Sequence, residues 1–338
     1  MESENNNPSE KIFGGGGGNP GKSVNGCDRE FANLIHTLNT NSWEHLVANL
    51  AIFAAALAKE NPGSYEDLKK WYGSWYRVGA FSIEDQGFLN YFGGLLRYLK
   101  ARAAELAALY DELADYRSKA TLKLILGHWM TMRPDMRYYG REWVYKHYFD
   151  LDLIPSGDNE VFVDCGAFIG DTLEEFISEY GTGYKSIYSF ELSPSTFEIM
   201  KKTAEKYPRV YPINAGVSNE NKEILFRDLS GQGAASGSRL AGGQGNAKSR
   251  VVRIDDEIKE DVTFIKMDVE GAEIDALLGA KEQILRNRPK LAISLYHNIS
   301  DLIEIPRLIR SFDKSYVFYM RQNPANVGFP SEYVLFAL

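Results

Sequence analysis

The part of the chain after Pro155 alternates short apolar runs with helical stretches, and this alternation limits the fold more than any other feature. Runs that are apolar along their length form strands buried on both faces, so the pattern predicts an α/β fold with a mostly parallel sheet covered by helices. The last two runs have only a turn-rich segment between them and are expected to form an antiparallel hairpin at one edge. The expected strands cover residues 161–165, 186–192, 209–213, 223–226, 250–254, 262–268, 290–296, 315–320 and 332–338, and the expected helices cover 172–180, 195–206, 272–286 and 300–312.

The first 150 residues have a different character. Residues 1–28 are rich in glycine and asparagine and poor in large apolar side chains, so we expect a disordered low-complexity tail. Residues 29–150 carry apolar groups at helical spacing and predict an all-helical N-terminal domain. Residues 151–338 then form the α/β domain. The expected N-terminal helices cover 43–59, 82–115 and 117–131. A further helix, between the first two of these, is expected to start with Ser64 as its N-cap.

Composition excludes several classes of protein. The chain has 38 Lys plus Arg against 46 Asp plus Glu, a net charge of −8, and no basic patch, which disfavours nucleic acid as a partner. It has 2 cysteines, so no disulfide framework is expected and a reducing compartment fits. No apolar run is long enough to span a membrane, and the N-terminus lacks the features of a signal peptide. We therefore expect a cytoplasmic protein.

A literal P-loop pattern occurs in the tail. Residues 16–23 read Gly, four residues, then Gly-Lys-Ser. That motif works only where a strand delivers the loop to the start of a helix, because the backbone amides must surround a phosphate. Only Ile12 and Phe13 precede the pattern, and no helical sequence follows it. We interpret it as an accident of a glycine run.

The strongest motif is the strand, glycine turn and helix start at 161–172. Gly166 lets the backbone approach a ligand, and Gly170 permits close packing of helix against strand. The two glycines are four residues apart, which is not the dinucleotide pattern. Asp164 would repel a pyrophosphate but favours a ligand with an ammonium and a sulfonium, and Glu191, at the end of the next strand, is placed to accept bonds from ribose hydroxyls. This combination favours S-adenosylmethionine.

Two carboxylates follow a later expected strand. Asp268 and Glu270 are two residues apart in an extended segment and so share a face, toward the crevice at the carboxyl ends of the strands. Carboxylates in this position can bind a metal, accept a proton or contact the ammonium of a methionine moiety. The alternative is that they stabilise the start of the helix that follows Gly271.

His297 follows the next expected strand and lies close to Asp268 if the two strands are neighbours. Its pKa near neutrality would let it accept a hydroxyl proton. A metal-ligand role and a surface position without function remain open. The other histidines fall in the helical half and form no set with metal-ligand spacing: His36, His45, His128 and His147.

Together these blocks resemble the FkbM family of S-adenosylmethionine-dependent methyltransferases. The resemblance covers about residues 155–338 and rests on the blocks FVDCGAFIGDT, SFELSPSTFEIM, NAGVSNENKEILF, VTFIKMDVEGAEIDALLGA and RPKLAISLYHN, in that order. It implies a Rossmann-like class I methyltransferase sheet and methyl transfer to a hydroxyl of a sugar, glycoside or other small metabolite.

The resemblance also assigns residues. The cofactor-binding residues it implies are Asp164, Gly166, Ala167, Gly170, Asp171, Thr172, Glu191, Ser193, Asn214 and Asp268. The catalytic residues would be Asp268, His297 and Glu270, and the same three would hold a divalent cation such as Mg²⁺ if one is used. Either Asp268 or His297 would act as the base.

Partners and competing functions follow from this reading. We expect a small hydroxylated acceptor, no nucleic acid, no membrane span and a homo-oligomer formed through the helical domain. The main alternative is a non-catalytic cofactor-binding or scaffold protein that retains the fold. A nicotinamide oxidoreductase is a weaker alternative, because an acid after the second strand also binds ribose in those enzymes.

Overall fold

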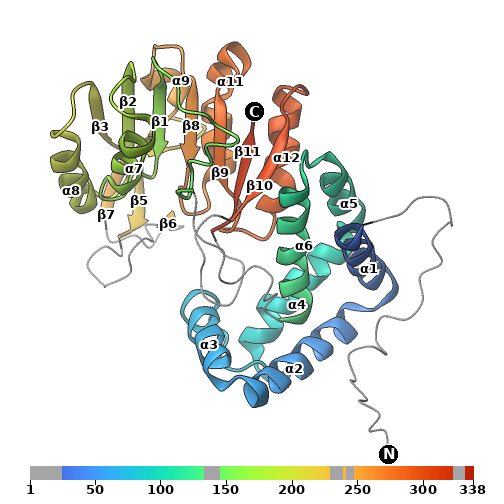
Figure 1. Ribbon diagram of the computed structural model, residues 1–338. Coiled ribbons are helices and arrows are strands. Elements are labelled where there is room, and N and C mark those ends of the chain that lie inside the picture. Colours follow the sequence, from blue (N-terminus) through green and yellow to red (C-terminus); the bar gives the residue numbers. More distant parts are fainter. Residues whose placement is uncertain (1–24, 133–144, 229–238, 241–246, 323–331) are drawn as a thin grey trace, which may run out of the picture. The chain divides into compact units, whose positions relative to one another are not determined.

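The computed structural model describes residues 25–132, 145–228, 239–240, 247–322 and 332–338 (Figure 1). The P-loop match, most of the expected tail and most of the glycine-rich segment 229–249 lie outside the described residues. The chain divides into two compact units. The first comprises the described residues up to Tyr110 and those from Lys119 to Met132, and the second comprises 111–118 and everything from Tyr145 on.

The first unit is helical, as expected, but some of its helix boundaries differ from the expected ones. The expected cap at Ser64 is wrong: the side chain of Asn61 accepts a hydrogen bond from the Ser64 N–H, and Pro62 occupies the first turn. Asparagine is a good N-cap and proline lacks the N–H that would go unpaired there, so the helix starts earlier. The expected helix 82–115 is interrupted at Arg102. The helices are α1 (Gly26–Thr40), α2 (Trp43–Glu60), α3 (Pro62–Tyr76), α4 (Gln86–Ala101), α5 (Ala103–Glu112) and α6 (Tyr116–Thr131).

The second unit contains a seven-stranded sheet in the order β10-β11-β9-β8-β1-β2-β3. Its strands are β1 (Val161–Cys165), β2 (Ser186–Glu191), β3 (Val210–Asn214), β8 (Phe264–Met267), β9 (Lys290–Ser294), β10 (Phe318–Arg321) and β11 (Val334–Ala337). Strands β3, β2, β1, β8 and β9 are parallel, whereas β11 is antiparallel to both β9 and β10. The predicted α/β fold and the predicted antiparallel hairpin are therefore confirmed.

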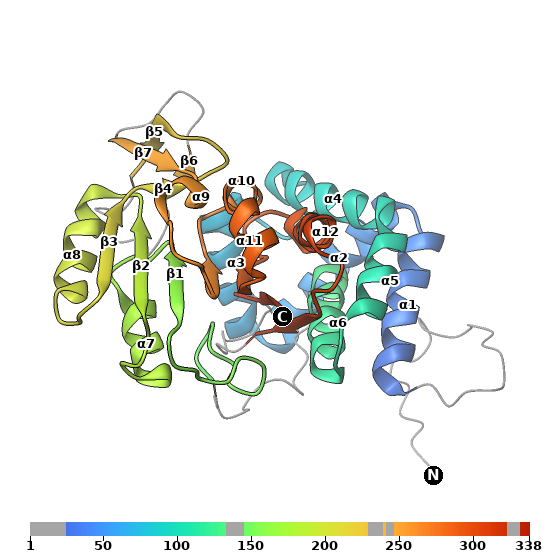
Figure 2. The ribbon, with the colours of Figure 1, turned by 90° about the horizontal axis from the view of Figure 1, so that it is seen from above.

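Helices cover both faces of this sheet (Figures 1 and 2). Helices α7 (Asp171–Tyr180) and α8 (Pro194–Ala204) lie on one face, and α10 (Glu273–Gly279), α11 (Lys281–Asn287) and α12 (Asp301–Phe312) lie on the other. An aromatic cluster fills the interface with α7, where the rings of Phe162 and Phe176 stack at 4.4 Å. Phe149, from the segment before β1, packs edge-on against both rings. The segment 145–150 thus belongs to the core of the sheet unit.

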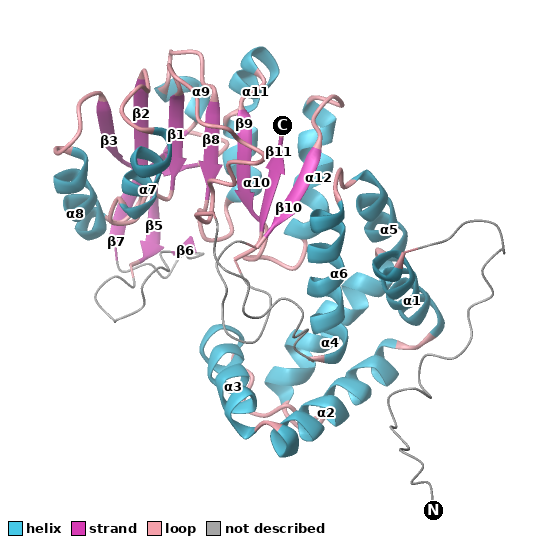
Figure 3. Cartoon of the chain, in the orientation of Figure 1, coloured by secondary structure: helices cyan, strands magenta, loops and turns pink. Residues whose placement is uncertain are grey.

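A second, four-stranded sheet follows the carboxyl end of β3 (Figure 3). Its order is β4 (Gly216–Val217), β7 (Ala247–Val252), β5 (Lys222–Arg227) and β6 (Arg239–Leu240). The expected strands 223–226 and 250–254 lie here instead of in the main sheet. Parallel strands need a crossover of about a dozen residues, and the short link between β4 and β5 cannot supply one.

None of the helices in the described ranges combines the length and the apolar character needed to cross a bilayer.

Candidate functional site

The loop between β1 and α7 is shaped by close backbone contacts. Gly166 has φ +80°, and a Cβ on it would lie 1.9 Å from the backbone oxygen of Asp268. Gly170 has φ +89°, and a Cβ there would lie 2.9 Å from Thr203. Both positions therefore require glycine, for the conformation and for the lack of space. The loop after β1 therefore lies directly against the backbone at the end of β8. A hollow lies beside this contact, at the carboxyl ends of the strands.

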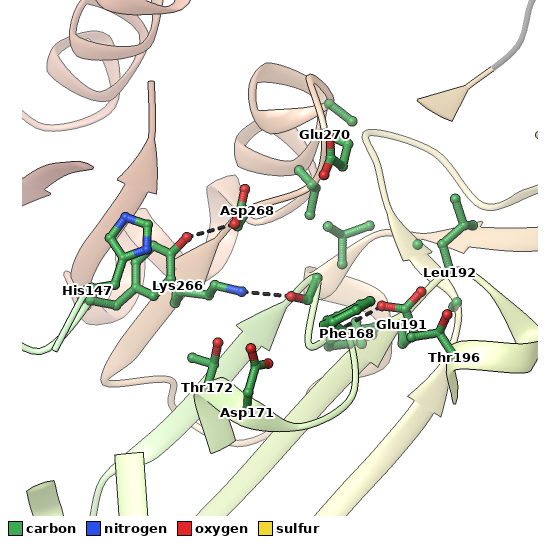
Figure 4. Close-up of a pocket in the computed structure, with 18 of the residues that line it drawn as sticks. His147, Phe168, Asp171, Thr172, Glu191, Leu192, Thr196, Lys266, Asp268 and Glu270 are labelled. Atoms are coloured by element: carbon green, nitrogen blue, oxygen red, sulfur yellow. Dashed lines mark hydrogen bonds between the residues drawn. The ribbon is translucent and has the colours of Figure 1, made fainter. Parts of the chain in front are cut away.

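A cavity of about 360 Å³ occupies this hollow (Figure 4). In the view of Figure 4, Asp171, Thr172, Lys266 and Asp268 lie on one side, and Glu191, Leu192 and Thr196 lie on the other. This is the position where open α/β sheets bind their ligands. The wall comprises His147, Tyr148, Gly166, Phe168, Asp171, Thr172, Glu175, Phe190, Glu191, Leu192, Thr196, Ala215, Gly216, Val217, Val251, Lys266, Asp268, Val269, Glu270, Ala272, Tyr296 and Glu332.

Glu191 ends β2 with its carboxylate in the cavity wall. One oxygen accepts a hydrogen bond from the Phe168 N–H at 3.0 Å and the other accepts one from the Ser193 N–H at 2.7 Å. Burial raises the pKa of Glu191 to about 7, against the lowering effect of these two backbone donors. The amide of Asn214 donates to the backbone oxygen of Glu191 at 2.9 Å and so links β3 to this corner.

Asp164 has a different contact from the one expected. Its carboxylate is fully buried and forms an ion pair with Lys266 at 3.0 Å, one strand away in register. The carboxylates of Asp164 and Asp268 outweigh burial and raise the pKa of Lys266, so Lys266 is an ammonium. The ammonium also donates to the backbone oxygen of Gly166 at 2.7 Å. Because Asp164 has this internal cation and lies behind the cavity wall, a direct contact with a cofactor stays a prediction.

Asp268 follows β8 and contacts two hydroxyls and an imidazole. The hydroxyl of Tyr148 donates to Oδ2 at 2.7 Å, and the hydroxyl of Tyr296 lies 3.0 and 3.1 Å from the two oxygens. The Nε2 atom of His297 lies 3.2 Å from Oδ1. Burial alone would raise the pKa of Asp268, but the charges of His297 and Lys266 outweigh it and hold that pKa below its ordinary value.

His297 lies among three carboxylates. Its Nδ1 atom lies 2.8 Å from Glu273 Oε1, while Nε2 faces Asp268 at 3.2 Å and Glu270 at 3.7 Å. Burial alone would lower the pKa of His297, but the hydrogen bond and charge of Glu273, with the charges of Asp268 and Glu270, raise it to about 9. Both ring nitrogens therefore carry protons at neutral pH, and His297 is an imidazolium.

This arrangement also tests the expected divalent cation. Asp268, Glu273 and His297 each place one ligand atom within 4.8 Å of the others. A metal would need a neutral imidazole with a free lone pair, because ligands must give up their protons. Here protons on both nitrogens complete the contacts to the carboxylates, and Asp268 accepts two phenols as well. The donor set fits a protonated histidine, and the Mg²⁺ expectation is not supported.

The structure brings together part of the predicted site. The predicted residues in the cavity wall are Gly166, Asp171, Thr172, Glu191, Asp268 and Glu270. The predicted residues outside the wall, which support it from behind, are Asp164, Ala167, Gly170, Ser193, Asn214 and His297. Of these, Ser193 caps α8 by accepting from the Thr196 N–H, as well as donating to Glu191.

Sequence reasoning missed several participants. Tyr148 and His147 come from a segment without strand pattern, assigned to the helical half. Lys266 and Glu273 stand inside the block VTFIKMDVEGAEIDALLGA, but no role was predicted for them. A charged residue inside an apolar strand, as Lys266 is, signals a buried partner and was the clue available.

Comparisons with known proteins agree with this geometry. Residues 164–318 match the family model described as the methyltransferase FkbM domain. The crystal structure of methyltransferase FkbM from Methylobacillus flagellatus KT is 23% identical, covers 82% of this chain and 71% of its own, and has a TM-score of 0.59. An rRNA methylase from Streptococcus thermophilus (14% identity, 56% and 92% coverage, TM-score 0.36) and a precorrin-6y C5,15-methyltransferase from Geobacter metallireducens GS-15 (13%, 59% and 92%, 0.35) are more distant. No curated protein matches.

The sheet unit therefore has a methyltransferase fold. The family match narrows this class, because residues 164–318 match the methyltransferase FkbM domain.

Proposed function

We propose that this protein transfers the methyl group of S-adenosylmethionine to a hydroxyl of a small metabolite, with sugars and glycosides as the first acceptors to test. The observation that carries the proposal is one cavity lined by two carboxylates of different character, the buried Glu191 and the half-buried Asp268. Glu191 can accept hydrogen bonds from the hydroxyls of a neutral sugar ring, and Asp268 can accept a proton from a reacting group.

The residues present fit the cofactor. Each oxygen of Glu191 accepts one backbone N–H, and a carboxylate oxygen has about two lone-pair sites, so each retains one for a ribose hydroxyl. Leu192, Val217 and Val251 form an apolar wall in the same cavity, which suits a flat base such as adenine. S-adenosylmethionine would supply a methyl group on a sulfonium, whose bond to sulfur breaks as the bond to the acceptor oxygen forms.

Of the two candidate bases, the geometry favours Asp268. His297 already carries both ring protons at neutral pH and cannot accept another. Asp268 is ionised, lines the cavity and can receive the acceptor's hydroxyl proton as the oxygen gains the methyl group. A carboxylate of low pKa is sufficient because the oxygen becomes strongly acidic only as the new bond forms.

Calorimetric titration with S-adenosylhomocysteine tests the cofactor assignment. We expect binding by the wild type, weaker binding by Glu191→Gln, and no binding of nicotinamide dinucleotides. A diphosphate cofactor that binds in preference would refute the assignment. Transfer of a labelled methyl group to a panel of glycosides and polyols then tests the reaction. Binding of S-adenosylhomocysteine without methyl transfer to any hydroxylated acceptor would favour the non-catalytic alternative.

A further inference from the structure

Tyr148 reaches the site from outside the strands that build it. It lies in the segment before β1, its side chain is 3% exposed, and its hydroxyl donates to Asp268 Oδ2 at 2.7 Å. The same hydroxyl lies 3.3 Å from Ser294 Oγ at the end of β9. Its ring lies 5.0 Å from the ammonium of Lys266. The buried hydroxyl of Tyr148 therefore has a defined position, and the Asp268 carboxylate in the cavity wall is its hydrogen-bond acceptor.

The segment that carries Tyr148 is fixed on its far side by a buried ion cluster. Asp150 is fully buried and accepts from Arg321 Nε at 2.9 Å and from Arg117 at 3.0 Å. Arg321, on β10, also donates to Asp115 at 2.6 Å. Breaking a buried cluster of this kind is strongly unfavourable, because it leaves an unpaired charge. Two residues from this anchor, the Tyr148 hydroxyl has little freedom to move.

The hydrogen bonds to Asp268 leave part of its lone-pair capacity unused. A carboxylate has about four lone-pair sites. The hydroxyls of Tyr148 and Tyr296 donate to this carboxylate, His297 pairs with its Oδ1 atom at 3.2 Å, and Asp268 still lines the cavity. The carboxylate therefore cannot rotate without losing a bond, and it retains lone-pair capacity for a group in the cavity.

We propose that Tyr148 is a positioning residue: its hydroxyl holds the Asp268 carboxylate so that a lone pair facing the cavity receives the hydroxyl of the acceptor. This inference rests on the proposed function. In the reaction the acceptor's O–H bond breaks, its proton goes to Asp268, the oxygen bonds the methyl carbon, and the electron pair of the S–CH₃ bond stays on sulfur. Tyr148 exchanges no proton in this step and acts only through Asp268.

The test needs no acceptor. Aspartate labelled with ¹³C at the carboxyl carbon reports the titration of Asp268 by NMR, with Asp268→Asn to assign the signal. The groups facing this carboxylate are Tyr148, Tyr296, His297, Lys266 and His147.

Tyr148→Phe keeps the ring and removes the hydroxyl, so we expect Asp268 to titrate about one pH unit higher than in the wild type. The matched control is Tyr316→Phe, which removes an equally buried hydroxyl that donates to the Pro289 oxygen at 2.8 Å. It should leave the Asp268 titration unchanged. A merely structural role of Tyr148 would give the same result in both variants and overturn the proposal.

Affinity for S-adenosylhomocysteine, measured on the same samples, separates this inference from the proposed function. If the wild type does not bind S-adenosylhomocysteine, the proposed function is refuted. If it binds but the Asp268 titration is the same in Tyr148→Phe as in the wild type, the role of Tyr148 is refuted. If Tyr148→Phe does not fold, the hydroxyl proton of Tyr148 is observed directly in the wild type. It should be protected from exchange and shift in Asp268→Asn, and an unshifted signal would overturn the proposal.

Discussion

His297 carries a proton that the folded chain holds more tightly than the unfolded chain does, and the free energy of unfolding must depend on it. Folding raises the pKa of this imidazole from 6.5 to about 9. The stabilisation is fully present below pH 6.5 and is lost as the pH rises through 9. The side chain is only 5% exposed, so water screens little of it. The difference between 6.5 and about 9 corresponds to about 3 kcal/mol.

Cys165 provides a signal for the unfolding of the sheet unit. The chain has 2 cysteines, both buried, so in a Cys27→Ala background Cys165 is the only thiol. A short, saturating pulse of a thiol reagent along a guanidinium gradient then measures the unfolded fraction at each pH. Between pH 7 and 10 the parent should lose about 3 kcal/mol more than His297→Gln.

His147→Gln is the matched control. Burial lowers the pKa of His147 to about 4, so this ring is neutral throughout the window and its loss should leave the slope unchanged. Titration of thiols and tyrosines in the unfolded chain is common to all variants and cancels. Equal slopes for the parent and His297→Gln would refute the imidazolium and the choice of base that follows from it.

Four further predictions follow from the site. Affinity for S-adenosylhomocysteine should fall as the pH drops below 7, by up to about tenfold per pH unit, because protonation of Glu191 (pKa about 7) removes an acceptor for ribose; calorimetry of Glu191→Gln should give a flat profile. Gly166→Ala should abolish that binding and cost about 3 kcal/mol of stability, whereas Gly181→Ala, at φ +72° with open space around it, should cost about 1 kcal/mol in chemical denaturation. Lys266→Met should destabilise the chain by about 4 kcal/mol, and adding Asp164→Asn should restore part of the loss in the same assay, since the single variant leaves a buried charge unpaired. Treatment with EDTA should leave methyl transfer unchanged, and a loss restored by Mg²⁺ would contradict the proton-bridged site.

The main sheet was predictable because most residues of its strands are apolar. The run at 161–165 coincides with β1, and all five residues are buried. Membership of a sheet was not predictable from the same property: the expected strand 250–254 contains apolar residues like the others, yet Val251 and Val252 belong to β7, which pairs antiparallel with β5. A strand's own residues show that it forms, whereas its partner depends on the length of its connections.

The site divides in the same way. Gly166, Glu191 and Asp268 follow strands, and the rule that ligands lie at the carboxyl ends places them together from sequence alone. Tyr148 lies 120 residues before Asp268 and follows no strand, so no local spacing relates the two. The pairing of Asp164 with Lys266 likewise requires that β1 and β8 are neighbours in this register.

Glu191 ends β2 and Asp268 follows β8 at the same edge of the sheet, and burial acts to raise the pKa of both carboxylates, yet their pKa values move in opposite directions. The difference lies in their surroundings. Neutral backbone N–H groups are the main donors to Glu191, so burial dominates and its charge is held weakly. Asp268 faces two cations, His297 and Lys266, which outweigh burial. Carboxylates whose environments separate their pKa values in this way take different roles. In the proposed reaction, the imidazolium and the buried lysine, more than the acids themselves, therefore decide which carboxylate binds and which receives the proton.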